Sequence, residues 1–470
     1  MTDAATKRGT ALTLVAAAQF VLQLDFSIVN VALPTIQREL HLVPADLQWI
    51  VTGYALTFGS LLLFGGRLGD LTGHRRLMMI GLVLFGVTSL SAGLAQTSFV
   101  LIASRFAQGA SAAMVAPQAL ATISDLFEEG APRTRALGLF QAATAGGASA
   151  GIVLGGILTQ YIGWRAIFLV NPPIIVLLVV MMMRFLPKDG ARRGARLDVA
   201  GAVLATSSIA TLIFGLSQGQ QKGFSAPVAL VALVAAALLA VAFVVTERRT
   251  AAPMVPFRIF SDVTRRTALL VMTLLGAVLA GYVYFISLYL QRVLHFSPIL
   301  TGLSLVPATG TVMIVSSILT RRFLARYGMK KVLLAGLISL GLGQFWLFHI
   351  SATGTYQVNV LGGLLFTAVG IGLLFPAVAV AVTQNVPPQD RGLAGGLFVT
   401  ALQVGSAVGL AALATIAAAR TASAHGQLVK GYQLSFMLCV AFVVVALFVV
   451  VVGIRPRAAA PAAPAPTANR

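Results

Sequence analysis

Asp25 and Arg105 are the two charged residues that lie well inside long apolar runs of this sequence. An ionisable group in hydrocarbon is costly and persists mainly where it has a function. Burial favours the protonated form of a carboxylic acid, whereas a nearby guanidinium favours the ionised form. A small rearrangement between the two groups would therefore bind or release a proton near neutral pH. Arginine stays protonated and would serve as a fixed charge beside the carboxylate.

The depths of the two residues along their apolar runs predict that they meet. If the run 11–33 starts in the cytoplasm, Asp25 lies about 21 Å from its cytoplasmic end at ~1.5 Å per residue. If the run 99–122 starts on the opposite side of a ~30 Å core, Arg105 lies at the same level, about 21 Å from the cytoplasm. We expect a proton-binding pair, and the alternative is a purely structural ion pair.

The composition indicates that helices crossing a membrane must position this pair. Of the 470 residues, 58% are hydrophobic and only 10% are charged, whereas soluble domains carry about a quarter charged residues. The single cysteine excludes an internal disulfide. Runs long enough to cross a bilayer recur along the chain, and ten-residue alternating strands do not. We expect an all-α integral membrane protein with fourteen transmembrane helices, at 11–33, 48–69, 77–96, 99–122, 136–159, 164–186, 197–217, 226–246, 267–291, 299–320, 332–350, 357–382, 393–417 and 431–454.

The positive charges predict the orientation of these helices. With both termini in the cytoplasm, 26 of the 33 lysines and arginines fall in cytoplasmic segments, six fall outside, and Arg105 lies within a helix. This asymmetry follows the positive-inside rule. The net charge of +20 is therefore explained by orientation in the cell (inner) membrane, and we expect no nucleic-acid partner.

An internal repeat divides the helices into two halves. Glycines of the segment 135–151 recur 258 positions later in the segment 394–409. Each half then holds six helices of parallel topology, with two inserted helices between them. We expect an N-terminal six-helix bundle at 1–190, a linker with the two inserted helices at 191–262, a C-terminal six-helix bundle at 263–456, and a disordered cytoplasmic tail at 457–470.

Four local patterns resemble one family, the fourteen-helix drug:proton antiporters of the major facilitator superfamily. LDFSIVNVALP (24–34) is similar to that family's pattern in its first helix, and RFAQGASAA (105–113) resembles its pattern for proton transfer in the fourth helix. GRLGDLTGHRRLM (66–78) resembles the superfamily's pattern between the second and third helices, with Leu71 and His74 in place of basic residues. The fifth helix has the glycine spacing of the antiporter pattern, although Ile152 replaces its usual proline.

The resemblance implies the major facilitator fold and roles for several residues. Asp25 and Arg105 would couple transport to protons. The carboxylate of Asp70 can face a helix N-terminus across the interface between the halves and hold an inner gate shut, although a solvated turn is the alternative. The gate pattern comprises Gly66, Asp70, Gly73, Arg75 and Arg76, and the antiporter glycines, which suggest a sliding interface between the halves, are Gly138, Gly147, Gly151, Gly155 and Gly156.

Substrate contacts are expected from polar and aromatic residues on several helices, although such residues taken singly more often serve in helix packing. These residues are Asn30, Gln108, Gln118, Gln141, Tyr284, Phe375 and Gln403. The inserted helices carry no charge within the membrane, so we interpret them as a peripheral pair facing lipid.

Several functional classes are excluded or disfavoured. No lysine directly follows a glycine, so the chain has no P-loop for an ATP-driven pump. The five histidines are scattered, which argues against a metal site or an embedded enzyme. Rings of charge and a filter-like loop, as in a channel, are missing. We expect a monomeric, proton-driven exporter of small amphipathic drugs or antibiotics, in contact with membrane lipids and with no cofactor except protons as the coupling ion. The alternatives are a dedicated exporter of one endogenous metabolite or lipid, and a non-transporting sensor on the same scaffold.

Overall fold

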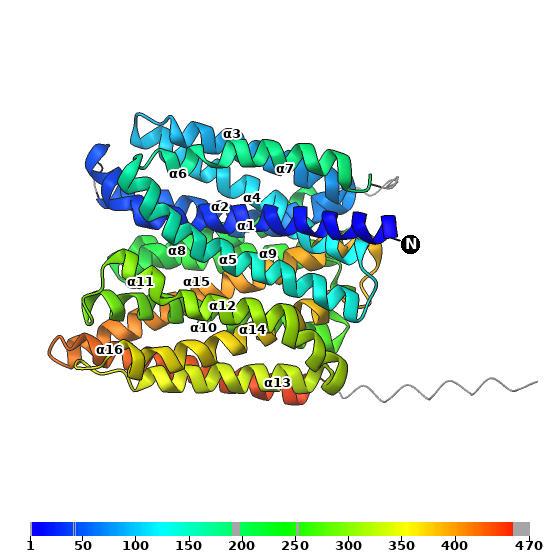
Figure 1. Ribbon diagram of the computed structural model, residues 1–470. Helices are drawn as coiled ribbons and strands as arrows, with labels where there is room; N and C mark the ends of the chain where they lie inside the picture. The colour runs from blue at the N-terminus through cyan, green and yellow to red at the C-terminus, as the bar shows by residue number, and fades with distance from the viewer. Residues whose placement is uncertain (1, 41, 43, 190–197, 251–252, 455–470) are drawn as a thin grey trace, which may run out of the picture.

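The structure is a bundle of long helices that run side by side (Figure 1). The computed structural model describes residues 2–40, 42, 44–189, 198–250 and 253–454, and these contain helices and no strands. The expected tail at 457–470 and the expected boundary at 191 lie outside these residues. The helices are α1 (Thr2–Glu39), α2 (Pro44–Thr72), α3 (His74–Gly93), α4 (Ser98–Leu126), α5 (Ala131–Tyr161), α6 (Ala166–Leu169), α7 (Asn171–Phe185), α8 (Val199–Lys222), α9 (Pro227–Arg249), η1 (Phe257–Phe260), α10 (Val263–Arg292), α11 (Pro298–Ser304), α12 (Val306–Ile314), η2 (Val315–Leu319), α13 (Thr320–Phe348), η3 (Tyr356–Leu361), α14 (Gly362–Thr383), η4 (Pro388–Asp390), α15 (Arg391–Ser423) and α16 (Leu428–Gly453).

The helices are long and apolar enough for a protein with many membrane crossings. Thirteen helical segments of the described chain could each span a bilayer, and one of them, Ile299–Phe348, has 50 residues. At ~1.5 Å per residue this segment is more than twice as long as a ~30 Å core requires. Its backbone leaves the helical conformation at Gly328, where φ is 77°. Since Gly328 separates the predicted helices 299–320 and 332–350, the segment accounts for two crossings, and the all-α membrane fold is confirmed.

Side-chain caps begin several of the helices at loop residues. The side chains of Thr97, Asp198, Asp262 and Ser297 each accept a hydrogen bond from a backbone N–H three residues later. Such caps satisfy one of the four backbone donors that a helix start leaves without a partner. The apolar runs between the caps then supply the faces that pack against other helices or against lipid.

The two halves use the same helix pairs. In the first half α1 packs along α5, and in the second half the corresponding α10 packs along α15. The repeated glycines explain the close approach of both pairs. A Cβ atom on Gly147 would lie 2.4 Å from the backbone oxygen of Phe20, and one on Gly405 would lie 1.9 Å from that of Thr273.

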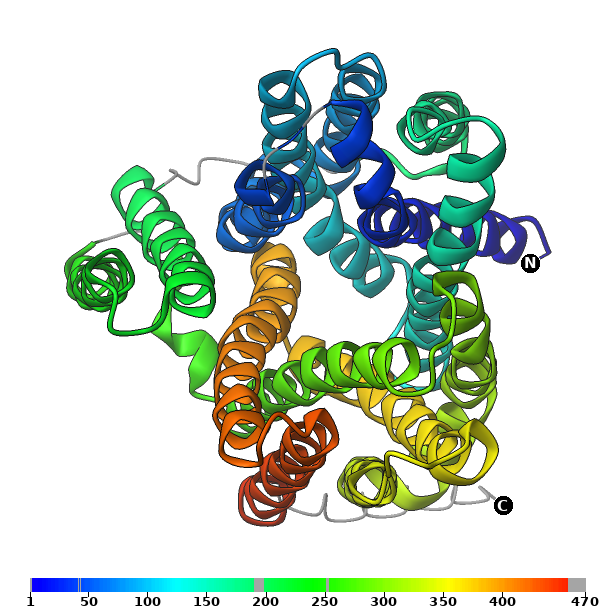
Figure 2. The same cartoon turned by 90° about the vertical axis from the view of Figure 1, so that its left-hand side faces the viewer.

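The inserted helices occupy a more specific position than the sequence suggested. Figure 2 shows α8 and α9 outside the main bundle, beside α2 and α15. α9 packs against α8, whereas α8 contacts α2 of the first half and α15 of the second half. Phe214 of α8 stacks on Trp49 of α2 with ring centroids 6.0 Å apart. The interpretation of the two inserted helices as a lipid-facing pair therefore applies to α9, whereas α8 covers the interface between the two halves.

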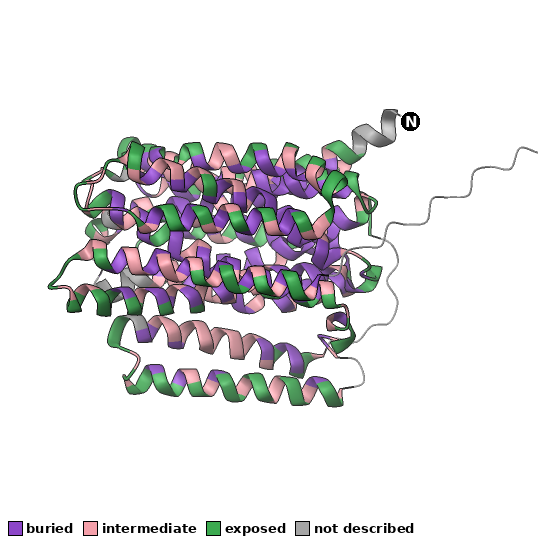
Figure 3. Ribbon diagram, turned by 90° about the horizontal axis from the view of Figure 1, so that it is seen from below, coloured by how far each residue is buried: buried purple, intermediate pink, exposed green. Residues whose placement is uncertain are grey.

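Buried residues concentrate in the centre of the bundle, and exposed ones follow its outer faces (Figure 3). One large hydrophobic cluster contains residues of both halves, and a smaller one contains residues of the first half. Large apolar side chains also cover the outer surface, for example Val231 of α9 and Phe448 of α16. An apolar outer surface suits contact with lipid acyl chains.

Candidate functional site: a buried carboxylate and an inner gate

The structure places Asp25 of α1 in direct contact with Arg105 of α4. Nη1 of Arg105 lies 2.7 Å from Oδ2 of Asp25. The same nitrogen donates to Oε1 of Gln108 at 2.8 Å, and Nε2 of Gln108 donates to Oδ1 of Asp25 at 3.3 Å. Gln108 follows Arg105 by three residues, so both side chains leave the same face of α4. The sequence analysis therefore predicted correctly that Asp25 and Arg105 lie at the same depth and meet.

Asn171, which the sequence analysis did not single out, completes the set of donors around Asp25. Nδ2 of Asn171 donates to Oδ1 of Asp25 at 2.7 Å and to Oγ of Ser89 at 2.9 Å. Asn171 is the first residue of α7 and the only amide side chain in the segment 166–185. A single amide in an otherwise apolar segment could have marked Asn171 as a candidate for the site. Three side chains thus donate to one carboxylate.

Aromatic rings and backbone close the site around Arg105. Its Nε donates to the backbone oxygen of Ile50 at 3.1 Å. Its guanidinium carbon lies 4.5 Å from the ring centroid of Tyr54 and 5.8 Å from that of Phe168. Asp25 is 0% exposed and Arg105 1% exposed. Both groups are therefore enclosed by protein in this conformation.

Asp70 of α2 contacts the N-terminus of α15 in the other half. Its Oδ1 accepts from the backbone N–H of Gly392 at 2.8 Å, and its Oδ2 accepts from that of Leu393 at 2.9 Å. A carboxylate at a helix N-terminus satisfies backbone donors and interacts favourably with the helix dipole. Gly66 permits the close approach, since a Cβ atom there would lie 2.5 Å from the backbone oxygen of Gly392. The geometry is that of a latch between the halves.

Further polar contacts join the halves on the same side. Arg391 of α15 pairs with Asp125 at the end of α4. Asp390 pairs with Arg67 of α2 at 3.5 Å and with Arg258 of η1 at 3.2 Å. These contacts close one end of the interface between the halves, the end that the charge distribution predicts to face the cytoplasm.

Arg75 and Arg76 make their described contacts within the first half. Their backbone N–H groups each donate to the carboxylate of Asp189 at 3.0 Å. The guanidinium of Arg75 also donates to the backbone oxygen of Met183 at 2.7 Å. The turn before them requires Gly73, whose φ is 106°. These three members of the predicted gate pattern therefore hold the loop between α2 and α3 against the end of α7.

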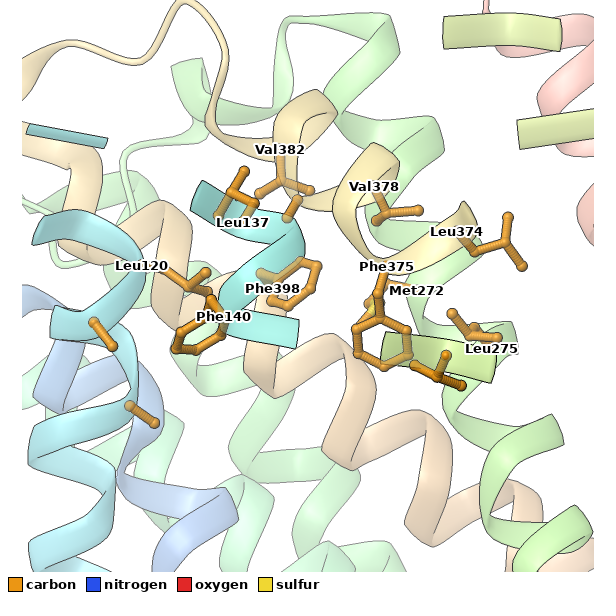
Figure 4. Close-up of a cluster of buried hydrophobic side chains, with 14 of the residues drawn as sticks. Leu120, Leu137, Phe140, Met272, Leu275, Leu374, Phe375, Val378, Val382 and Phe398 are labelled. Carbon is orange, nitrogen blue, oxygen red and sulfur yellow. The ribbon is translucent and has the colours of Figure 1, made fainter. Parts of the chain in front are cut away.

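A cluster of buried apolar side chains from both halves, here called the plug, lies between the two halves. Figure 4 shows side chains of α4 and α5 facing side chains of α10, α14 and α15. Phe375 and Phe398 meet edge to face, with ring centroids 6.2 Å apart. The labelled residues of this cluster are Leu120, Leu137, Phe140, Met272, Leu275, Leu374, Phe375, Val378, Val382 and Phe398, of which Leu374 packs on Gly336 of α13 within the second half.

The antiporter glycines divide between two interfaces, which corrects the expectation of a single sliding surface. Gly147, Gly151 and Gly155 are spaced by four residues, so they share one face of α5, and that face packs on α1 within the first half. Gly138 and Gly156 face the other half instead. A Cβ atom on Gly138 would lie 2.1 Å from the backbone oxygen of Ser316, and one on Gly156 would lie 3.5 Å from Cγ1 of Ile299.

Three of the residues proposed for substrate contact have other partners in this conformation. Gln108 belongs to the Asp25 network. Gln118 is also 0% exposed, and its Nε2 donates to the backbone oxygen of Gly65 at 2.7 Å. Phe375 is buried in the plug. None of the three can reach a substrate until the halves separate.

The other four residues proposed for substrate contact differ in exposure. Gln141 is buried on α5, and Gln403 is partly buried on α15. Asn30 and Tyr284 are exposed, on α1 and α10 respectively. Substrate binding by these residues stays a prediction.

The sequence pattern that describes the Major Facilitator Superfamily matches residues 15–410. The chain belongs to this superfamily. Relatives over most of the chain include the cephamycin export protein of Amycolatopsis lactamdurans, 38% identical over 91% of this chain and 89% of the relative. The puromycin resistance protein of Streptomyces alboniger is 35% identical over 89% and 83%. The multidrug resistance protein Stp of Mycobacterium tuberculosis is 34% identical over 85% and 74%.

Two solved structures share the fold of this superfamily member. The human organic anion transporter MFSD10 superposes with a TM-score of 0.70, at 16% identity, over 94% of this chain and 99% of the other. The proton:xylose symporter XylE superposes with a TM-score of 0.64, at 14% identity, over 94% and 96%. The chain is thus a multi-pass membrane transporter with the fold expected from its sequence. Within the described residues no group of three or more histidine, cysteine, aspartate or glutamate side chains is arranged to hold a metal ion.

Proposed function

We propose that this transporter exports small amphipathic organic molecules, antibiotics foremost, in exchange for protons. The observation that carries the proposal is the single membrane carboxylate, Asp25, held by Arg105, Gln108 and Asn171 in a site enclosed by protein. The names of relatives across most of the chain suggest the substrate class, since they describe export of or resistance to cephamycin, puromycin and lincomycin.

In the proposed cycle the two halves rock against each other around a central site. With the inner end closed by Asp70 and the plug, a movement of α1 and α4 exposes Asp25 to the outside. A proton binds there and releases Asp25 from Arg105. The halves then separate at the inner end, the proton leaves to the cytoplasm, and a substrate binds. The return to the outward-facing state releases the substrate outside, where the next proton binds. Residues of α1, α4, α5, α10, α14 and α15 would line the substrate site.

A second candidate function is export of one dedicated compound. The observation in its favour is that the names of two relatives describe export of a single compound, cephamycin in one and tetracenomycin C in the other. Both functions use the same proton site and differ only in the selectivity of the substrate site. In either case we propose that the protein works as a monomer in the cell membrane, with both termini in the cytoplasm.

Transport into inverted membrane vesicles tests the proposal. An imposed pH gradient, acid inside, should drive uptake of labelled puromycin, and uptake should stop when nigericin collapses the gradient. A competition panel with a cephamycin, lincomycin and a cationic dye then separates the two candidates. Competition by several unrelated compounds supports a multidrug exporter, and uptake of one compound alone supports a dedicated one. Uptake that survives collapse of the gradient would contradict proton exchange.

A further inference from the structure

Phe214 of the inserted helix α8 begins a stack of three aromatic rings that ends beside Arg105. Its ring centroid lies 6.0 Å from that of Trp49 on α2, and the centroid of Trp49 lies 6.0 Å from that of Phe106 on α4. The interplanar angles are 20° and 26°, so both pairs are stacked. Phe106 directly follows Arg105, which bonds Asp25. The stack therefore connects α8 to the turn of α4 that presents Arg105 to the carboxylate.

The N-terminal turns of α2 hold this turn of α4 at three points. Nε of Arg105 donates to the backbone oxygen of Ile50 at 3.1 Å, and Oγ1 of Thr57 donates to that of Phe106 at 2.7 Å. A Cβ atom on Gly53 would lie 2.6 Å from Cε2 of Phe106, so the ring rests on the backbone of α2. A displacement of α2 at this level therefore acts on both the guanidinium and the backbone that carries it.

Trp49 links these contacts to α8. It directly precedes Ile50 and is partly buried, with ring partners on both α4 and α8. If α8 were absent, the surface that it covers would meet lipid acyl chains, which are as apolar as a ring but are not fixed in position. A stacked aromatic pair adds a preferred geometry to apolar burial. Phe214 therefore restricts where Trp49, and with it the start of α2, can lie.

The helix α8 is itself held by several neighbours, so it can serve as a fixed support. Gly215 of α8 packs on α9, where a Cβ atom would lie 3.1 Å from the side chain of Leu233. Ile213 of α8 and Gln403 of α15 meet at Gly59 of α2, since a Cβ atom there would lie 2.9 Å from Cδ1 of Ile213 and 4.0 Å from Cβ of Gln403. The helix is thus packed between α9, α2 and α15 (Figure 2).

Loosening the stack should act on Asp25 in one direction. Nη1 of Arg105 lies 2.7 Å from Oδ2 of Asp25, which is the short end of the range for a charge-assisted hydrogen bond. Added freedom can therefore only lengthen this contact on average, and the attraction between opposite charges falls with their separation. Because a nearby positive charge favours the ionised carboxylate, Asp25 should then keep its proton up to a higher pH.

The other groups around the pair do not reverse this sign. Gln108 lies one turn after Arg105 on α4, so its hydrogen bond to Asp25 would lengthen as well. Asn171 belongs to α7, which contributes no ring to the stack. Tyr54 of α2, whose ring centroid lies 4.5 Å from the guanidinium carbon, carries no charge near neutral pH. Among the residues that the structure describes, Arg105 is the charged group that contacts Asp25.

We propose that the inserted helix α8 positions the proton site, and that Phe214 is the side chain through which it acts. Phe214 is a positioning residue, because it fixes Trp49, and α2 then fixes the turn of α4 that carries the guanidinium of Arg105. The inserted helices then take part in proton binding, beyond covering the interface between the halves. The proposal rests on the proposed function, because it requires Asp25 to bind a proton, but it does not depend on the substrate.

Chemical labelling of Asp25 tests the proposal without transport. Dicyclohexylcarbodiimide reacts with protonated carboxyl groups in apolar surroundings, and mass spectrometry of the peptide that contains Asp25 gives the labelled fraction at each pH. Phe214→Leu keeps most of the side-chain volume but removes the ring. We expect it to raise the pH of half-maximal labelling by about half a unit, since a stacked pair contributes roughly what a shift of half to one unit represents. Phe214→Tyr keeps the ring and should keep the value of the parent chain.

Further variants show whether the effect passes through the stack and Arg105. In an Arg105→Ala chain, Phe214→Leu should cause no additional shift, because two changes that act on one contact are not additive. Trp49→Leu removes the middle ring and should raise the value too, so it carries the test if Phe214→Leu does not fold. Phe224→Leu is the matched control and should leave the value unchanged. Phe224 packs on Gly219 within the hairpin of the inserted helices, where a Cβ atom would lie 2.4 Å from its ring.

Two kinds of result would contradict the proposal, and they are distinguishable. A folded Phe214→Leu chain with the parent value, an equal shift in Phe224→Leu, or a shift that persists without Arg105 would overturn the role of α8 alone, while Asp25 stays a proton site. Labelling of Asp25 that does not change with pH in the parent chain would overturn proton binding at this site, and with it both the proposed function and this inference.

Discussion

Replacing Asp70 by asparagine should open the inner gate without unfolding the protein. The asparagine would keep the size of the side chain but would lose its charge and one of its two acceptor oxygens. The amide would also place N–H groups against the backbone donors of Gly392 and Leu393, which now lie 2.8 and 2.9 Å from the carboxylate. A hydrogen bond to a charged group contributes about 1.5–3 kcal/mol. We therefore expect the closed state to lose about 2 kcal/mol, which changes the ratio of open to closed gate by about 30-fold.

A pair of nitroxide spin labels at Glu128→Cys and Ala325→Cys, two exposed positions on the inner ends of the two halves, measures this change as a growth of the long-distance population in a chain that also carries Cys439→Ala. Asp189→Asn is the matched control, since Asp189 also accepts two backbone N–H bonds at a helix start, but within one half. It should leave the distances unchanged. The reasoning is refuted if Asp70→Asn keeps the distances of the parent chain and transports at its normal rate, or if Asp189→Asn opens the gate equally.

Three further outcomes follow from the geometry of the halves. Gly138→Ala would place a Cβ atom 2.1 Å from a backbone oxygen of η2, so it should destabilise the closed gate by about 1–3 kcal/mol. Gly146→Ala is the control and should leave the gate unchanged, because its Cβ atom would lie 3.7 Å from the nearest side-chain atom. The same pair of spin labels measures both variants. Arg105→Ala removes the guanidinium from Asp25 and leaves the donors Gln108 and Asn171 in place. Because loss of a nearby positive charge disfavours an ionised carboxylate, the pH optimum of efflux should rise, and an unchanged optimum would show that the two groups are not coupled. Reporter fusions after Lys188 and after Lys222 should report cytoplasm and exterior respectively, and the same side at both would contradict the fourteen-helix topology.

The crossings and the central ion pair could be predicted because the bilayer restricts the possibilities. Apolar length, positive loops and a count of intramembrane charges left Asp25 and Arg105 as partners at one depth. The latch at Asp70 could also be anticipated, since a carboxylate beside a tight turn suits a helix N-terminus. These inferences depend on charge and length, which a sequence states directly.

Other features of the site depend on how helix faces rotate toward each other, which this sequence did not reveal. Asn171 is uncharged, and amides of this kind are common in ordinary helix packing. The spacing of Gly147 and Gly151 predicted a close helix contact, but the identity of the partner as α1 depended on the fold. The place of α8 against both halves was hidden for the same reason, because an apolar helix looks alike whether lipid or protein covers it.

Proton exchange at Asp25 is the central claim, and proton-coupled uptake into proteoliposomes tests it most directly. The parent chain and Asp25→Asn are reconstituted with a pH indicator and labelled substrate, and uptake against a gradient is recorded together with proton movement. Asparagine is nearly isosteric with aspartic acid and can still bond Arg105, so the protein should fold and equilibrate substrate down its gradient. The account predicts that Asp25→Asn neither accumulates substrate nor moves protons with it. Accumulation by Asp25→Asn at the parent rate, with proton movement intact, would contradict it.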